Sequence, residues 1–465
     1  MSRGRAYALV AAVCALPRLA VVAIERGDIL LAYTEKSDDF ARTLVASGTV
    51  GFIPGVPSAY TQPLYTFFLA PLYWVFGRHW LVVGLAQTLV AVATALLVYE
   101  IGRRIASARV GIVAAVLATL HPYLVWHDVH VNREILDTLL AAAIVLVTLA
   151  VAERLVLEQH KRLPTNRTER ADEELVLEQH KPSSTHGAVG VDENLVFQKH
   201  KVPPSGVWLW GAALGALLGL AILGNSRLVL LPLVVLGYLV WRLRSARTIL
   251  ALGAAGAAAV ILVLAPWVVR NGASVGCYAI TTDTRALWKA NNPATYDLLA
   301  DGKWIDDVPN IPGAQLSPEF QAAIFADRGE LIEVDECAQM RFYRGLVTDF
   351  WREQPGEKGK LAVQAAGMLW SPTFTVEREE RSQGLVGVAK DWGEPLYMVA
   401  LYLLAAVGIF LVSRSFAVLV VALLAYNTLA AMVFVGNVRY RVPWDLLLAL
   451  LAAVALELAR RVRAR

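Results

Sequence analysis

The 465-residue sequence contains few charged residues and few cysteines. Only 18% of its residues are charged, against about 25% in an average soluble domain. Its three cysteines, with no Cys or His pairs at metal-ligand spacing, exclude a disulfide-scaffolded domain and a zinc module. The net charge of +4 comes from arginines in short loops rather than from one basic face, which argues against a nucleic-acid partner. What the chain does have is 57% hydrophobic residues in long runs, a composition typical of a polytopic membrane protein.

Long apolar runs recur along the whole chain. A helix that crosses about 30 Å of hydrocarbon needs roughly 20 mostly apolar residues. Ten stretches fit, at 6–24, 81–101, 109–126, 133–152, 207–224, 226–242, 247–269, 394–412, 415–434 and 441–459. The stretch 62–77 is shorter and starts with Gln62-Pro63, so we interpret it as an interfacial helix. We therefore predict an all-α membrane protein with about ten transmembrane helices, the fifth and sixth forming a tight hairpin at 224–227.

The arginines of the short loops predict the orientation. Cytoplasmic loops carry an excess of Lys and Arg. With ten spans, one side of the membrane receives Arg3, Arg5, Arg103, Arg104, Arg109, Arg242, Arg244, Arg247, Arg414, Arg460, Arg461, Arg463 and Arg465. The first run ends without a small-x-small cleavage site, so we interpret it as an anchor. We expect a multi-pass protein of the cell membrane with both termini in the cytoplasm.

Two polar regions divide the spans into modules. Residues 1–152, 207–270 and 394–465 form the N-terminal, central and C-terminal membrane modules. Residues 153–206 form an inner insert with a 20-residue repeat at 155–161, 175–181 and 195–201, which we expect to be a flexible or weakly helical loop. Residues 271–393 form an acidic, extracytoplasmic segment of mixed structure with 18 Asp and Glu against 12 Lys and Arg. Its Cys277 and Cys337 either pair or stay as free thiols.

Ionisable residues gather at the outer ends of the predicted helices. Charges at membrane depth are costly and usually functional. Anchoring at the interface explains arginine and tyrosine there, but not carboxylates. Arginines can hold a phosphate group, and a carboxylate beside them can act as a general base, so the pattern suits group transfer from an anionic lipid. The residues come from four loops: Glu35, Asp38, Asp39 and Arg42; His127, Asp128, His130 and Glu134; Arg270; Arg439 and Arg441.

Several motifs, in this order, resemble one known family. The first outer loop has Asp38-Asp39-Phe40-Ala41, Gly48, Gly51-Phe52 and Pro57 to Tyr65. Later come Gly102-Arg103-Arg104, His121-Pro122-Tyr123 with Arg133-Glu134, Arg270-Asn271, Trp288 with Asn291-Asn292-Pro293, and Arg439-Tyr440-Arg441. Together they resemble GT-C glycosyltransferases of the protein-mannosyltransferase-like and aminoarabinose-transferase-like branch. The resemblance covers nearly all of the chain except the inner insert.

The resemblance implies an inverting transferase with a polyprenyl-phosphate sugar donor and an extracytoplasmic site. It implies a catalytic acid at Asp38 or Asp39, with Asp38 preferred and Glu35 as a third candidate, and a second acid at Glu134. Arginines expected near the donor phosphate are Arg270, Arg439 and Arg441. Gln62 stands where many relatives have a basic residue, so the donor phosphate is held by other arginines or the donor differs.

The remaining site residues have less specific expected roles. We place Glu35, Gln62, Tyr65, His127, Asp128, His130, Trp288, Asn291 and Asn292 at the substrate cavity, with the last three on the acceptor side. No cofactor is required, although His127, Asp128 and His130 offer ligands to a divalent cation. The simpler interpretation is that the two histidines are polar interfacial residues that contact the acceptor or water. The expected partners are a polyprenyl-phosphate-linked sugar, membrane lipids and a glycan, lipid or protein acceptor.

Two other functions fit the sequence. One is a transporter or flippase of a lipid-linked sugar, although such proteins usually show repeated halves and polar residues at the midplane. The spans show no repeat, and the polar residues lie at the outer helix ends. The other is a membrane receptor or assembly subunit that keeps this fold without catalysis.

Overall fold

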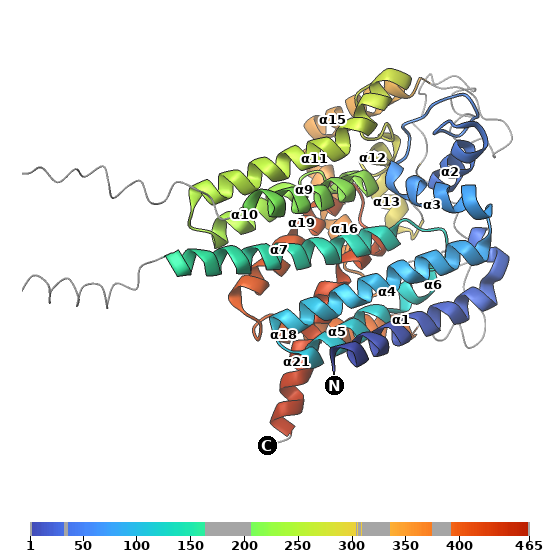
Figure 1. Ribbon diagram of the computed structural model, residues 1–465. Coiled ribbons are helices and arrows are strands. Elements are labelled where there is room, and N and C mark those ends of the chain that lie inside the picture. The colour runs from blue at the N-terminus through green and yellow to red at the C-terminus, as the bar shows by residue number, and fades with distance from the viewer. Residues whose placement is uncertain are drawn as a thin grey trace, which may run out of the picture.

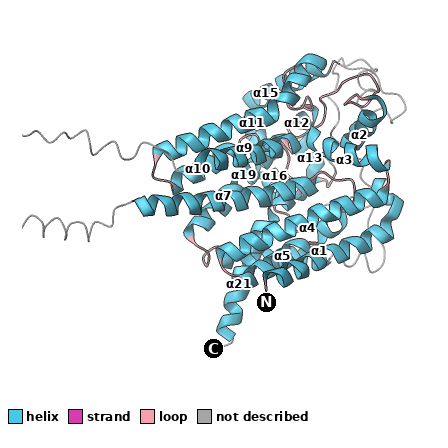
Figure 2. Ribbon diagram, viewed as in Figure 1, coloured by secondary structure: helices cyan, strands magenta, loops and turns pink. Residues whose placement is uncertain are grey.

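The computed structural model describes residues 2–31, 36–162, 206–303, 305, 308, 335–373 and 392–463. Within these residues the chain is helical and contains no strand (Figure 2), only an isolated bridge between Ile53 and Val56. This confirms the all-α class, and the described part of the outer segment is helical rather than mixed. Most of the inner insert lies outside the described residues, as does Glu35.

The N-terminal module contains one long membrane helix at its start and two more after a helical outer loop. Its elements are α1 (Arg3–Glu25), η1 (Arg26–Leu30), α2 (Lys36–Ser47), α3 (Pro63–Phe76), α4 (Trp80–Ile105), α5 (Ala108–Thr119), α6 (Pro122–His127) and α7 (Glu134–Arg162). Helix α7 continues past the predicted end of its span, so the first copy of the 20-residue repeat is part of this helix.

The central and C-terminal modules flank the outer segment. The central elements are α9 (Val207–Gly224), η4 (Ser226–Leu228), α10 (Leu231–Arg242) and α11 (Ala246–Ser274). The outer segment contains α12 (Arg285–Lys289), α13 (Thr295–Ala300), α15 (Glu336–Glu353) and α16 (Pro355–Leu369). The last module has α18 (Glu394–Gly408), α19 (Arg414–Val433), α20 (Val438–Arg441), η8 (Val442–Trp444) and α21 (Asp445–Arg463).

Seven helices in the described part of the chain are long and apolar enough to span a membrane. They are Arg3–Leu30, Trp80–Ile105, Glu134–Leu157, Val207–Gly224, Ala246–Ser274, Arg414–Val433 and Val438–Arg463. The other three predicted spans hold shorter helices, α5 with 12 residues, α10 with 12 and α18 with 15. Proline explains the first: the residue before a proline disfavours helix, and the chain is extended at His121, just before Pro122.

The helices form one bundle with the polar segments at one end (Figure 1). Both termini lie at the bottom of the view and the end of α7 and the start of α9 at its left, whereas α2, α3, α12 and α13 lie toward the upper right. A disulfide between Cys277, just after α11, and Cys337 of α15 joins two parts of the outer segment, and their Cα atoms are 5.9 Å apart. The two cysteines therefore pair.

Helices α9 and α11 pack closely because glycine lines their contact. Gly211, Gly215 and Gly219 repeat every four residues on one face of α9, and a Cβ on Gly215 would lie only 2.2 Å from the carbonyl oxygen of Gly256 in α11. Small residues let membrane helices approach in this way.

We predict that Gly215→Ala destabilises the protein by about 1–3 kcal/mol, the usual cost of overpacking. Gly237→Ala in α10 is the matched control, because no heavy atom lies within 4 Å of its Cβ position. There alanine should gain up to about 1 kcal/mol from helix propensity. Thermal unfolding in detergent measures both, and equal shifts for the two variants would contradict the close α9–α11 contact.

Candidate functional site

A cluster of polar side chains surrounds Glu134 at the start of α7. Arg439 of α20 binds one oxygen of the Glu134 carboxylate at 2.7 Å, and that side chain is buried. The other oxygen, Oε2, has no hydrogen-bond partner among the described residues. Next to it, Arg133 donates to the amide oxygen of Gln62 at 2.7 Å. The structure thus brings together three predicted site residues, Gln62, Glu134 and Arg439.

The α9–α10 turn contributes to the same cluster. Gln62 donates to Ser226 at 3.1 Å, and Asn225 donates to Asp137, one turn below Glu134, at 3.2 Å. Arg227 stacks on the ring of Tyr440 at 3.5 Å. We refer to the Glu134 cluster as the set formed by Gln62, Arg133, Glu134, Asp137, Asn225, Ser226, Arg227, Arg439 and Tyr440.

Sequence reasoning missed the turn residues of this cluster. The run Gly224-Asn225-Ser226-Arg227 predicts a tight hairpin and does not by itself indicate a functional site. The signal that could have found Arg227 is its position, a permanent charge between two long apolar runs, where charges are usually functional.

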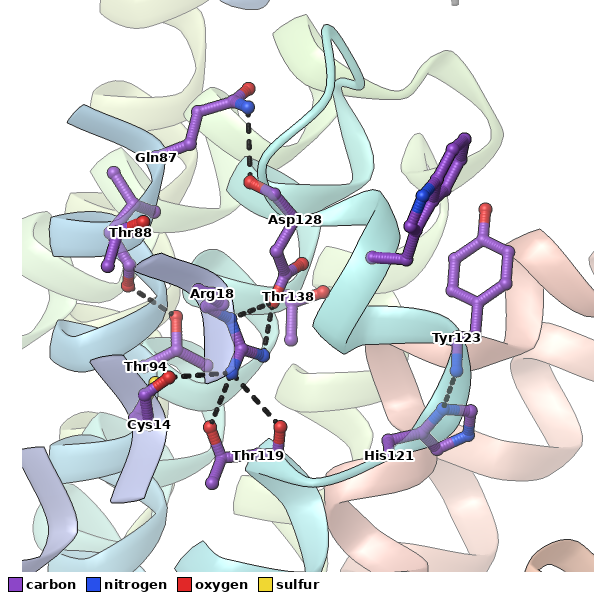
Figure 3. A network of polar contacts seen from close by, with 12 residues as sticks. Cys14, Arg18, Gln87, Thr88, Thr94, Thr119, His121, Tyr123, Asp128 and Thr138 are labelled. Carbon is purple, nitrogen blue, oxygen red and sulfur yellow. Dashed lines mark hydrogen bonds and ion pairs between the residues drawn. The ribbon is translucent and has the colours of Figure 1, made fainter. Parts of the chain in front are cut away.

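A buried network holds the chain segment that leads to Glu134 (Figure 3). Arg18, in the middle of α1, pairs with Asp128 at 2.5 Å. Its guanidinium also donates to the carbonyl oxygens of Cys14 and Thr119, each at 3.1 Å. The side chains of Arg18 and Asp128 are only 1% and 6% exposed. Asp128, predicted at the cavity, is therefore engaged by Arg18 inside the bundle.

The same network continues toward Glu134 through hydrogen bonds to the backbone. Gln87 donates to the carbonyl oxygens of Asp128 and His130, at 3.1 and 2.7 Å. Tyr65 donates to Gln87 at 2.5 Å and accepts from the N–H of Asn132 at 2.9 Å. The Asn132 side chain in turn accepts from the N–H of Glu134. Tyr65, expected at the cavity, positions the segment before α7.

The three candidate acids of the first outer loop differ in their surroundings. Asp38 is fully buried, accepts from Tyr73 at 2.6 Å and pairs with Arg78 at 2.8 Å. Its partners therefore join the start of α2 to the end of α3. The Asp39 side chain is 20% exposed and lies 3.6 Å from Arg42. Glu35 lies outside the described residues.

Asp38 and the Glu134 cluster are also separated along α3. Tyr73, which donates to Asp38, lies eleven residues after Gln62, which contacts Arg133. At 1.5 Å per residue this corresponds to about 16 Å along the helix. No hydrogen bond or ion pair joins Asp38 to Glu134 in the described part of the chain.

All three arginines expected at the donor phosphate have protein partners. Arg270 donates to the carbonyl oxygens of Ser58 and Val50, at 2.7 and 2.8 Å. Arg441 is fully buried, pairs with Asp445 at 3.0 Å and donates to two further carbonyl oxygens. Arg270 thus holds the first outer loop and Arg441 anchors the start of α21, whereas Arg439 lies in the Glu134 cluster.

The first outer loop is also clamped by the outer segment. Glu336 of α15 accepts from the hydroxyl of Ser58, from the N–H of Ala59 and from Thr282. Nearby, Lys36 pairs with Asp283 at 3.1 Å. Burial opposes ionisation of Asp283, but Lys36 and Arg285 outweigh it and lower the pKa of this carboxyl group.

His127 and His130 make aromatic contacts. His127 stacks on Tyr123 and His130 on Trp126, each with ring centroids 3.7 Å apart. His130 also lies 3.8 Å from Glu25, and burial lowers its pKa. Among the described residues, no three His, Cys, Asp or Glu side chains group as metal ligands.

The Trp288 to Asn292 motif joins the outer segment to the membrane helices. Asn291 donates to the carbonyl oxygen of Val433, the last residue of α19, at 3.0 Å. Lys358 of α16 donates to Asn291 at 2.5 Å and to the carbonyl oxygen of Met432 at 2.7 Å. Trp288 packs against α15, and Asn292 bonds to the backbone of α12. These contacts place the motif in a joint between helices.

Comparison with known proteins identifies a related family. Residues 57–160 match the family model of the dolichyl-phosphate-mannose-protein mannosyltransferases. This stretch includes Gln62, Asp128 and Glu134, and the match confirms the resemblance to glycosyltransferases drawn from the sequence. No match is found among the curated proteins.

Three matching solved structures come from Archaeoglobus fulgidus. Its oligosaccharyltransferase in the apo form is 13% identical with a TM-score of 0.48, covering 98% of this chain and 52% of that one. The same enzyme tethered with an acceptor peptide is 13% identical with a TM-score of 0.49, and the match covers 98% of this chain and 50% of that one. The oligosaccharyltransferase AglB in complex with an inhibitory peptide and a dolichol-phosphate is 11% identical with a TM-score of 0.45, and the match covers 98% of this chain and 51% of that one. The present chain spans about half the length of these proteins.

We predict that Arg18→Met destabilises the protein by about 3–5 kcal/mol, because it leaves the Asp128 carboxylate buried without its cation. The double variant Arg18→Met, Asp128→Leu should recover most of this loss, since it removes both charges. Chemical denaturation in detergent gives the free energies of unfolding. A double variant as unstable as the sum of the single variants would mean that the two residues do not act as a pair.

The buried amino group of Lys358 should make the stability of the protein depend on pH. Burial lowers its pKa to about 8, whereas an unfolded lysine titrates near 10.4. Between these values the unfolded chain binds more protons, so stability should rise with pH over this window. Lys358→Met should remove this rise. Melting temperatures of both proteins from pH 7.5 to 10.5 check it, and parallel curves would contradict it.

Proposed function

We propose that this chain is an integral-membrane, inverting glycosyltransferase that transfers a sugar from a polyprenyl-phosphate donor to an extracytoplasmic acceptor. We further propose that it lies in the cell membrane with both termini in the cytoplasm, following the arginine pattern of its short loops. The observation that carries the proposal is the Glu134 cluster, in which a carboxylate and several arginines meet within and beside the stretch that matches the mannosyltransferase family.

The charges of the cluster suit a phosphodiester. Arg133, Arg227 and Arg439 face two carboxyl groups, Glu134 and Asp137, so the arginines outnumber the acids and the cluster keeps an excess of positive charge. A sugar linked to a lipid through one phosphate carries one negative charge. Arginine binds phosphate oxygens through charge-assisted hydrogen bonds, and we assign this role to Arg439 and Arg227.

The reaction we propose is a single displacement. A nucleophilic atom of the acceptor forms a bond to the anomeric carbon while the bond from that carbon to the phosphate oxygen breaks. The electron pair leaves with the lipid phosphate, where arginines stabilise the developing charge, and the acceptor proton moves to a carboxylate. Within the first outer loop we favour Asp39 or Glu35 for that carboxylate over Asp38, because Asp38 is fully buried between Tyr73 and Arg78. We assign Glu134 as the second acid.

The test uses the detergent-purified full chain and radiolabelled polyprenyl-phosphate sugars, with the mannose donor first because the matched family carries that name. We expect Glu134→Gln and one of Asp39→Asn and Glu35→Gln to lower kcat by about 100-fold or more, the usual share of an acid–base group. The melting temperature of the Asp39 and Glu35 variants should stay near that of the parent protein. Asp38→Asn and Glu134→Gln should each lower it, because each weakens a buried ion pair.

Other outcomes would favour other functions. Binding of a donor with no transfer, together with counterflow across vesicles, would replace the transferase by a transporter. Full activity of the Asp39, Glu35 and Glu134 variants would show that the catalytic groups lie elsewhere.

A further inference from the structure

A short segment closes on itself within the first outer loop. The N–H of Ser58 donates to the carbonyl oxygen of Val50 at 2.9 Å, so the two ends of this segment meet. A Cβ on Gly51 would lie only 2.3 Å from the carbonyl oxygen of Val56, so the backbone between the two ends is tightly folded. We refer to this segment as the 50–58 loop.

Two opposite charges hold the ends of the 50–58 loop. Arg270, near the end of α11, donates to the carbonyl oxygens of Ser58 and Val50, at 2.7 and 2.8 Å. Glu336, the first residue of α15, accepts from the Ser58 hydroxyl and, at 2.9 Å, from the N–H of Ala59. Hydrogen bonds to a charged group are stronger than those between neutral groups. The position of the loop therefore depends on where α11 and α15 present these two side chains.

One disulfide joins the segments that carry these charges. Cys277, just after α11, follows Arg270 by seven residues, and Cys337 comes directly after Glu336. The bond fixes the first turn of α15 to the chain just after α11, across a sequence separation of 60 residues. A cross-link over so long a separation removes much of the conformational freedom of the chain between its ends. The disulfide thus keeps Glu336 within reach of the 50–58 loop.

The rest of α15 is held by contacts that do not involve the disulfide. Tyr343, two turns after Glu336, packs against Trp288 of α12. Thr284, just before α12, donates to the carbonyl oxygen of Met340 at 3.1 Å. Loss of the disulfide would therefore free the first turn of α15, which carries Glu336, while the contact between α12 and α15 remains.

The disulfide borders a cleft of about 410 Å³. The cleft lies between the 50–58 loop, the end of α11 and the start of α15, and it is lined by Val56, Pro57, Ser274, Val275, Gly276, Asp335, Cys337 and Arg341. A cleft of this volume has room for a small thiol compound beside Cys337.

We propose that the disulfide between Cys277 and Cys337 is a redox-dependent latch on the 50–58 loop and acts through Glu336. In the oxidised protein, Glu336 holds the end of the loop. A small dithiol opens the latch by thiol–disulfide exchange. One of its thiolates attacks a cysteine sulfur, so that a mixed disulfide forms and the other cysteine leaves as a thiolate. The second thiol of the reagent then displaces the remaining cysteine, the reagent becomes a cyclic disulfide, and its two protons pass to the two cysteines.

Gln62 links the latch to the Glu134 cluster. It follows Ser58 by four residues, and its amide oxygen accepts from Arg133 at 2.7 Å. Release of the loop would therefore loosen the segment that presents Gln62 to this cluster. The inference concerns the position of the loop and does not depend on the reaction proposed above.

The test follows backbone hydrogen exchange by mass spectrometry in the full-length protein in detergent, before and after treatment with dithiothreitol. After reduction, the N–H groups of Ser58 and Ala59 should exchange about tenfold faster or more, because the hydrogen bonds that protect them open more often. Peptides from residues 343–350 of α15 should keep their exchange rate. The double variant Cys277→Ser, Cys337→Ser should show the fast exchange without reductant.

Two variants serve as controls for the reagent and for the helix. Cys14→Ala removes the buried free thiol of α1 and should leave the response to dithiothreitol unchanged. Glu353→Gln removes an exposed acid at the other end of α15 and should keep both the slow exchange and the response.

Glu336→Gln tests whether the latch acts through this side chain. A glutamine accepts through one oxygen instead of two, so the N–H of Ala59 should exchange fast even in the oxidised variant, and reduction should add little. Slow exchange at Ala59 in this variant would overturn the role of Glu336.

Three further results would each overturn the latch. The first is unchanged exchange at Ala59 after alkylation and mass measurement show that both cysteines are reduced. The second is a disulfide that dithiothreitol leaves intact in the folded protein. The third is faster exchange along the whole of α15, which would mean that the bond supports the outer segment as a whole and not the position of the loop.

Discussion

The pairing of Arg18 with Asp128 is the constraint on which the candidate site depends. A guanidinium in the middle of a membrane helix is tolerated only with a partner, and the partner lies in the segment between α6 and α7. Once that segment is held, Gln87 and Tyr65 satisfy its backbone, and the N–H of Glu134 is capped by Asn132. The position of Glu134 thus depends on the ion pair by which Asp128 neutralises Arg18 of α1.

The charged groups that support the fold differ from the Glu134 cluster in their partners. Arg270, Arg441, Asp38 and Asp128 each have protein partners that hold loops or helix ends. In the Glu134 cluster, by contrast, carboxylate oxygens stay unpartnered among the described residues, and positive charge exceeds negative. Because unpaired buried polar groups are costly, such a cluster is stable only if something else in the fold offsets it. Here the offset is the large apolar and glycine-lined packing of the bundle.

The sequence allowed most of the fold to be predicted, because hydropathy is a local property. Seven of the ten predicted spans are long helices, and the proline that shortens α5 was visible in the sequence. The site was predicted less completely. Asp38 and Glu134 both stand beside predicted outer helix ends, and only the fold shows that one meets Arg78 and the other Arg439. Partners 40 and 305 residues away cannot be assigned from spacing. Arg227 was missed because the turn motif explained its neighbours without it.

Helix α7 is one continuous helix that joins two ends of the molecule. Its 29 residues correspond to ~44 Å, more than the thickness of the hydrocarbon layer. Glu134 and Asp137 lie on its first turn, and the first copy of the repeat, 155–161, lies near its other end. A continuous helix transmits rotation about its axis from one end to the other. A rotation of α7 imposed at its repeat end would therefore reorient both carboxylates at its other end.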